Sequence, residues 1–366
     1  MKMQLEETQE MLRASAREFL SESCPLKQVR EVRAHSGGFS ADLWGQMAEL
    51  GWMGLPLPEA AGGSGMGLLD LCLLIEEMGH ACVPSPFVEA IAGSGLLLAE
   101  AGGHADVLQK VATGEAIVIP AFGGLDDEDG HNQPPAVRKD GGKFVIDGAH
   151  LFVPYGAVAT HFLCLAQGDP APGKALLLVP ASAKGVTVTP LQSMRDERPC
   201  RVDFAGVTLD AAALVSSGDE AERLLNAALR HMDLARCFDN AGALAWVLED
   251  TITYAKDRKQ FGQPLAAFQV IQHYCADMHV MLEGIRMSAY YAAWKMSEGQ
   301  EATRDIAVAC AYAHDVIPRY LGIAHQIHGA MGVTIEHDLH LYSTRATAPA
   351  HGFAPTSQYL DAVLST

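Results

Sequence analysis

The sequence predicts an α+β multidomain protein with an N-terminal α-helical domain, a middle antiparallel β-sandwich or barrel, and a C-terminal four-helix bundle. Apolar residues recur at helical spacing before about residue 115 and again after about residue 218. Between these regions, short segments rich in Val, Ile and Phe alternate with Gly, Pro and Asp, as antiparallel strands do. A chain of 366 residues is long enough for several such domains. We therefore expect domains at residues 1–114, 115–216 and 217–366.

The first domain is expected to consist of helices. Residues 4–23 carry apolar side chains on one helical face. Two further helices, at 68–82 and 86–102, are rich in small and apolar residues. On the first of these, the adjacent Glu76 and Glu77 are expected to form its solvated edge.

The middle and last domains differ in the length of their elements. The middle domain has short strand-like segments and an acidic, proline-containing loop at 123–135. The last domain has three long helical faces, at 225–252, 268–289 and 302–327, as a bundle of long helices requires.

Composition excludes several classes of function. The net charge of −18 argues against a nucleic-acid partner and against an anionic membrane surface. There is no uninterrupted apolar run of transmembrane length, and the start MKMQLEE lacks an apolar signal core. The eight cysteines contain no CxxC pair, which is typical of reduced thiols. We expect a cytoplasmic protein.

Three segments of the last domain carry more than a helical core. RKQFGQPLAAFQ (258–269) brings a cation, an aromatic ring and an amide to one corner between helices, although an ordinary hairpin with an exposed arginine is the alternative. QIHGAMG (326–332) interrupts a helix with glycines, so that a ligand can approach the main chain. FAPTSQ (353–358) forms a polar turn near the end of the chain.

In this order and spacing, the three segments resemble the acyl-CoA dehydrogenase family, and so does the order of the domains. The resemblance implies the fold of that family and implies FAD and an acyl-CoA thioester as ligands. In the family a glutamate removes the α-proton of the thioester while the β-hydrogen leaves as hydride to the flavin, which yields a trans-enoyl-CoA.

The resemblance also implies the residues that contact FAD. In the family, the first two segments reach the FAD of a neighbouring subunit, and a guanidinium suits its pyrophosphate. In this chain, where Ala330 replaces a usual glycine, the matching residues are Arg258, Phe261, Gln269, Gln326, Gly329 and Gly332. The last segment adds the flavin-facing Thr356 and Gln358.

In the family, each subunit also contacts its own FAD through motifs of the middle domain, and in this chain those motifs are incomplete. The family's Thr-Glu-Pro and Gly-x-Gly-Ser-Asp pattern is missing from the stretch 116–130. Pro154 and Tyr155 stand where hydrogen bonding to the flavin edge is expected.

Both positions at which the family places its catalytic glutamate hold alanine, namely Ala354 and Ala235. An alanine cannot accept a proton, whereas a positioned base contributes about 10²–10⁴ in rate. Asp239 is a weak candidate for a relocated base, and Glu249 is another. Asp233 and Arg236 match family residues that line the substrate pocket.

Four histidines surround the glycine break, namely His325, His328, His337 and His340. Their spacing does not form a closed set of metal ligands, so we expect surface or core histidines and no metal site.

The resemblance therefore implies a subunit of an FAD-dependent acyl-CoA dehydrogenase that is active in a heteromeric complex. A paralogous subunit would supply the glutamate, an electron-transfer flavoprotein would accept the electrons, and a steroid- or bile-acid-derived CoA thioester would be the substrate. Gly242 and its alanine neighbours hint at room for a bulky acyl group. Two alternatives stay open: a self-sufficient homotetramer with a relocated base, and a non-enzymatic structural or regulatory paralogue.

Overall fold

The computed structural model describes residues 5–35, 38–123, 133–168, 173–193, 198–347 and 354–365. The chain divides into two compact units, each built from segments that are far apart in sequence. One unit comprises Met1–Glu31, Leu68–Val83 and Asp233–Thr366, and the other comprises Val32–Gly67 and Pro84–Met232.

The second unit contains an eight-stranded sheet with the order β6-β7-β3-β2-β4-β5-β8, to which β1 adds by pairing with β4. The strands are β1 (Val118–Ala121), β2 (Ala136–Asp140), β3 (Lys143–Val153), β4 (His161–Gly168), β5 (Lys174–Pro180), β6 (Val186–Pro190), β7 (Cys200–Leu209) and β8 (Leu214–Ser217). Most pairs are antiparallel, as predicted, but β4 runs parallel to both β1 and β2, so the sheet is mixed. The apolar run of β4 is buried on both faces, which explains why its sequence does not alternate.

Short helical segments complete this unit. They are α3 (Ala41–Glu49), a π-helix at Val88–Gly95, α5 (Leu96–Ala101) and α6 (Ala105–Ala112), while α2 (Leu26–His35) belongs partly to each unit. Ser40 precedes α3 and caps it, because its side chain accepts a hydrogen bond from the Leu43 amide at 3.3 Å.

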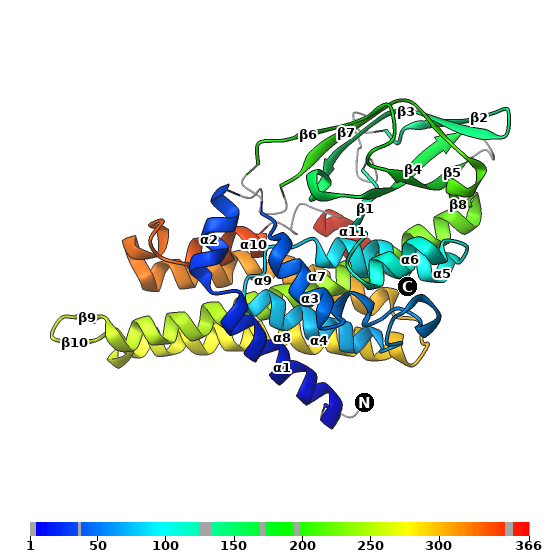
Figure 1. The fold of residues 1–366 in the computed structure, drawn as a ribbon. Coiled ribbons are helices and arrows are strands. Elements are labelled where there is room, and N and C mark those ends of the chain that lie inside the picture. Colours follow the sequence, from blue (N-terminus) through cyan, green and yellow to red (C-terminus); the bar gives the residue numbers. More distant parts are fainter. Residues whose placement is uncertain are drawn as a thin grey trace. The chain divides into compact units, whose positions relative to one another are not determined.

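The first unit is helical. Its elements are α1 (Glu7–Ser23), α4 (Leu68–His80), most of α7 (Asp219–Asp257), α8 (Gln269–Ser297), α9 (Thr303–His328), α10 (Leu339–Thr347) and α11 (Thr356–Leu364). A small hairpin of β9 (Lys259–Gln260) and β10 (Gln263–Pro264) joins the long helices α7 and α8 (Figure 1). The predicted order of helices, strands and long helices is confirmed. Among the described residues, no helix is both long and apolar enough to cross a membrane.

The prediction that Glu76 and Glu77 form a solvated edge is wrong. Both side chains are 2% exposed. Arg13 of α1 donates to Glu77 at 2.9 Å, and Arg286 and Tyr290 of α8 donate to Glu76, each at 2.8 Å. These partners come from distant helices, so the local sequence of α4 does not reveal them, and they offset the cost of burying two carboxylates.

The hint of free space at Gly242 is also wrong. A Cβ atom on Gly242 would lie 1.8 Å from the carbonyl oxygen of Glu76, and one on Gly79 would lie 2.1 Å from that of Asp239. Glycine at these positions therefore lets the main chains of α4 and α7 touch. The main chain of α4 fills the space beside Gly242, which leaves no room there for an acyl group.

Candidate cofactor and substrate site

The hairpin between α7 and α8 presents the first group of predicted residues to solvent. Arg258 follows the last turn of α7 and is exposed, and Gln269 is the exposed first residue of α8. The Phe261 side chain is 92% exposed, and its backbone has a φ of 54°. A left-handed backbone is unfavourable for phenylalanine, and so is a fully exposed aromatic ring. This geometry suits a residue that is buried by another molecule.

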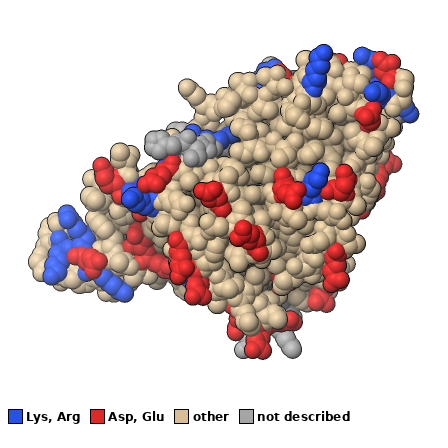
Figure 2. All heavy atoms as spheres, viewed as in Figure 1, with Lys and Arg blue, Asp and Glu red and all other residues tan. Residues whose placement is uncertain are grey.

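The end of this hairpin is basic, although the chain as a whole is acidic. Lys256, Arg258 and Lys259 are all exposed. Figure 2 shows Lys and Arg side chains gathered where the hairpin lies in Figure 1, while Asp and Glu are scattered over the rest of this face. Such a tip fits an anionic group.

The second predicted group lies where α9 ends. Gly329 has a φ of 59° and a ψ of −139°, a conformation that glycine alone adopts readily. Gly332 is buried, and a Cβ atom there would lie 2.9 Å from the Cβ of His328. Gln326 and Gly329 are exposed, and the turn that follows exposes three apolar side chains, Met331, Val333 and Ile335. Both glycines therefore have a conformational or packing reason to be there, while the approach of a ligand to the main chain stays a prediction.

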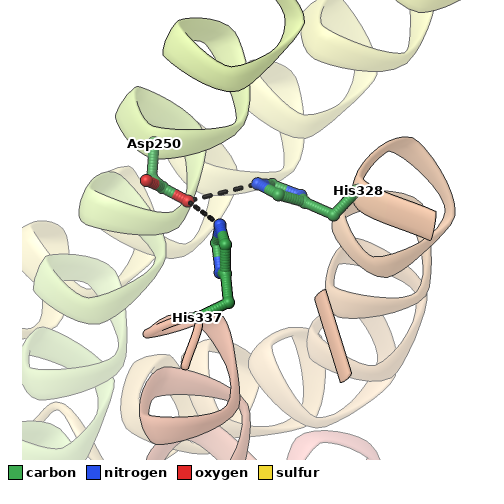
Figure 3. Close-up of side chains that lie close together, drawn as sticks. All are labelled: Asp250, His328 and His337. Carbon is green, nitrogen blue, oxygen red and sulfur yellow. Dashed lines mark hydrogen bonds and ion pairs between the residues drawn. The ribbon is translucent and has the colours of Figure 1, made fainter. Parts of the chain in front are cut away.

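Two of the four histidines that the sequence places around the glycine break, His328 and His337, form a cluster with Asp250, which sequence reasoning missed. Asp250, His328 and His337 point toward one another from α7, the end of α9 and the segment before α10 (Figure 3). The Asp250 Oδ2 atom lies 3.2 Å from Nε2 of His328 and 3.7 Å from Nε2 of His337. Tyr254 stacks on the His328 ring with centroids 4.5 Å apart. The feature of the sequence that could have predicted this cluster is the spacing of Asp250 and Tyr254, which are four residues apart and therefore share one face of α7.

The two positions of the missing base lie in this helical unit. Ala235 is fully buried on α7, and Ala354 is half-buried just before α11. Gln358 is exposed, while the Thr356 hydroxyl lies 3.2 Å from Nδ1 of His314 on α9. Neither alanine offers a proton acceptor.

Asp233 and Arg236 are brought together, but α11 of the same chain closes over them. The Tyr359 hydroxyl donates to Asp233 at 2.8 Å, and burial raises the pKa of Tyr359, which keeps it a donor. What is left is a cavity of about 10 Å³, the size of one water molecule, with the lining Asp233, Arg236, Cys237, Asn240, Cys310, Ala313, His314 and Tyr359. Sequence reasoning missed Tyr359, which follows the quoted TSQ directly.

Both candidate relocated bases are engaged in ion pairs. Asp239 is 3% exposed and accepts hydrogen bonds from Arg345 at 2.6 and 3.0 Å. Glu249 lies 3.0 Å from His80, and this hydrogen bond lowers the pKa of Glu249. A carboxylate stabilised in its charged form is a weaker base.

The predicted flavin-edge segment of the sheet lies in the other unit. Tyr155 is 5% exposed, and its backbone has a φ of 52°. Within the stretch 116–130, residues 124–130 lie outside the described part of the chain.

Comparisons with known proteins agree with this architecture. Two family models match: the acyl-CoA dehydrogenase N-terminal domain over residues 6–115 and the acyl-CoA dehydrogenase C-terminal domain over residues 222–352. Acyl-CoA dehydrogenase FadE27 of Mycobacterium tuberculosis is 29% identical over 332 residues, which is 87% of this chain and 86% of that protein.

Two solved structures are similar over nearly their whole length. A chain of the ChsE4-ChsE5 complex from Mycobacterium tuberculosis superimposes with a TM-score of 0.90 at 26% identity, covering 100% of this chain and 98% of that one. A chain of the Tcur3481-Tcur3483 steroid acyl-CoA dehydrogenase gives a TM-score of 0.87 at 26% identity, covering 98% and 97%. The two family models span both helical parts of the sequence and support FAD as the cofactor. This chain belongs to the acyl-CoA dehydrogenase family.

Proposed function

We propose that this chain is the non-catalytic subunit of a heteromeric, FAD-dependent acyl-CoA dehydrogenase. The observation that carries the proposal is a contrast within one helical unit. Both positions for the catalytic base hold alanine, whereas the residues that would serve a neighbour's cofactor are retained, and all of them except the buried Gly332 are exposed. A chain that performed the reaction alone would need the base, and an inert one would not need the exposed set.

The exposed set fits a dinucleotide that is approached from outside. The Arg258 guanidinium suits a pyrophosphate, the Phe261 ring offers a flat apolar face, and Gly329 allows close approach of the main chain. Bound FAD would accept the hydride of the desaturation. The partner's glutamate would take the α-proton, and an electron-transfer flavoprotein would then reoxidise the complex.

The substrate is proposed from the similar structures that are heteromeric complexes. Two of the similar structures are pairs of differently named chains, and one is named a steroid acyl-CoA dehydrogenase. We take the substrate to be a CoA thioester of a steroid- or bile-acid-derived acyl group, desaturated between its α and β carbons. All eight cysteines, each within the described residues, are free thiols, in keeping with a proposed cytoplasmic location.

Substituting Arg258 tests the proposal. In the complex with the partner subunit, Arg258→Ala is expected to weaken FAD binding by about 10- to 100-fold, because a charge-assisted hydrogen bond to phosphate is lost. Arg304→Ala, which removes another exposed arginine of the same unit, should leave the affinity unchanged. Flavin fluorescence titration of the apo-complex measures both, and equal affinities for all three proteins would refute the cross-subunit contact.

A further inference from the structure

The residues proposed to contact the partner's FAD come from two separate segments, the hairpin after α7 and the turn after α9. One cluster connects them. Asp250 lies on α7, about two helical turns before Arg258, which directly follows that helix. His328 is the last residue of α9 and directly precedes Gly329.

His328 is held by α7 at three places. Its side chain is fully buried, and its Nε2 atom faces Asp250 at 3.2 Å. The ring stacks on Tyr254 at an interplanar angle of 27°, and the Tyr254 hydroxyl donates to the His328 carbonyl at 3.3 Å. Gly332 packs directly on the Cβ of His328, so the position of this histidine also sets the course of the turn.

The hydrogen bonds determine where the ring protons lie. Nδ1 of His328 is 2.8 Å from the Ala324 carbonyl, which can only accept, so Nδ1 carries a proton. Nε2 therefore needs a second proton to bond the Asp250 carboxylate. The Leu339 amide donates to Nδ1 of His337 at 3.2 Å, which places the proton of that ring on Nε2, toward the same Asp250 oxygen. Burial lowers the pKa of His337 and keeps its ring neutral.

This pattern decides between a metal centre and a hydrogen-bonded clasp. The three ligand-type atoms lie within 4.8 Å of one another, as a metal site would require. A histidine that ligates a metal usually donates its other ring N–H to an acceptor, however, whereas Nδ1 of His337 receives a hydrogen bond. His337 thus turns an N–H group toward Asp250 at 3.7 Å, while Nε2 of His328 lies within hydrogen-bonding distance of the same oxygen at 3.2 Å. An N–H group that faces the carboxylate leaves no lone pair there for a metal, so the arrangement favours the clasp.

We propose that Asp250 is a positioning residue that acts through His328 to hold the α7 hairpin and the 329–333 turn as one cofactor-binding unit. The inference rests on the proposed function, since it concerns residues given there to the partner's FAD. It makes the half-buried Asp250, which is not among the residues proposed to contact FAD, a determinant of FAD affinity. It also explains why Asp250 and Tyr254 of α7 both contact the end of α9.

The test compares two substitutions of Asp250 in the complete complex. Asp250→Ala is expected to weaken FAD binding about tenfold, because the buried ring loses a charged hydrogen-bond partner. Asp250→Asn should restore most of the affinity, since the amide can donate to Nε2 of a neutral His328. Asp277→Ala, which removes an exposed carboxylate on α8, is the matched control and should behave as wild type.

FAD titration, thermal unfolding of the apo-complex and metal analysis of the same samples separate the outcomes. Unchanged FAD affinity in Asp250→Ala would overturn the proposal. So would a metal that co-purifies with wild type and is lost, together with FAD affinity, in Asp250→Asn. If Arg258→Ala weakens FAD binding but Asp250→Ala does not, the positioning role fails while the proposed function stands. If Arg258→Ala has no effect, the proposed function itself fails.

Discussion

Replacing Arg345 with alanine is expected to destabilise this chain by about 3–5 kcal/mol, because it leaves a buried carboxylate without its partner. Arg345 donates to both oxygens of Asp239, whose side chain is 3% exposed, and to the Val83 carbonyl at 2.9 Å. The pair therefore ties α10 to α7 and to the end of α4. Urea unfolding of the purified chain, followed by circular dichroism, measures the loss.

Two further variants make this expectation specific. Arg138→Ala breaks a pair with Asp140 in which both side chains are more than 60% exposed, and should cost at most about 1 kcal/mol. The double variant Arg345→Met with Asp239→Ala removes both charges and should be more stable than Arg345→Ala alone. If Arg345→Ala unfolds within about 1 kcal/mol of wild type, Asp239 is not a buried structural ion, and its role as a base would be reopened.

Replacing Gly242 with alanine should destabilise the chain by at least about 3 kcal/mol, because the new methyl group would overlap the main chain of α4. The Cβ atom would lie 1.8 Å from the Glu76 carbonyl oxygen and 2.7 Å from the His80 amide nitrogen. Neither is the movable end of a side chain, so one of the two helices must shift.

Gly322 provides the matched control, because it also lies inside a long helix but has no atom within 4 Å of its Cβ position. Gly322→Ala should be neutral or stabilising by up to about 1 kcal/mol, since alanine favours the helix. The same urea unfolding measures both variants. Equal stability of the two would contradict the close contact of α4 with α7.

The parts of this protein that the sequence predicts correctly depend on local patterns. Helical periodicity locates α7, α8 and α9, and the glycines of QIHGAMG mark the interruption after His328. These patterns lie within a few residues of the structure that they determine, so they can be recognised in the sequence alone.

The features that it does not predict depend on partners distant in the chain. Glu76 can be buried because Arg286 pairs with its charge and Tyr290 donates a hydrogen bond to it, and both lie more than 200 positions away. Tyr359 covers Asp233 across 126 positions, and His328 meets Asp250 across 78. The parallel pairing of β1 with β4 likewise depends on which strands become neighbours, and neither strand's own sequence specifies that.

The central claim is that this chain serves a flavin site whose catalytic base belongs to another chain. The most direct test is the visible absorbance of the purified protein, and its bleaching by an acyl-CoA thioester, for the chain alone and after co-expression with the partner subunit. The account predicts a colourless chain alone, and a yellow complex with one FAD for each pair of chains that the thioester reduces. A yellow chain that is reduced by the thioester without any partner would contradict it.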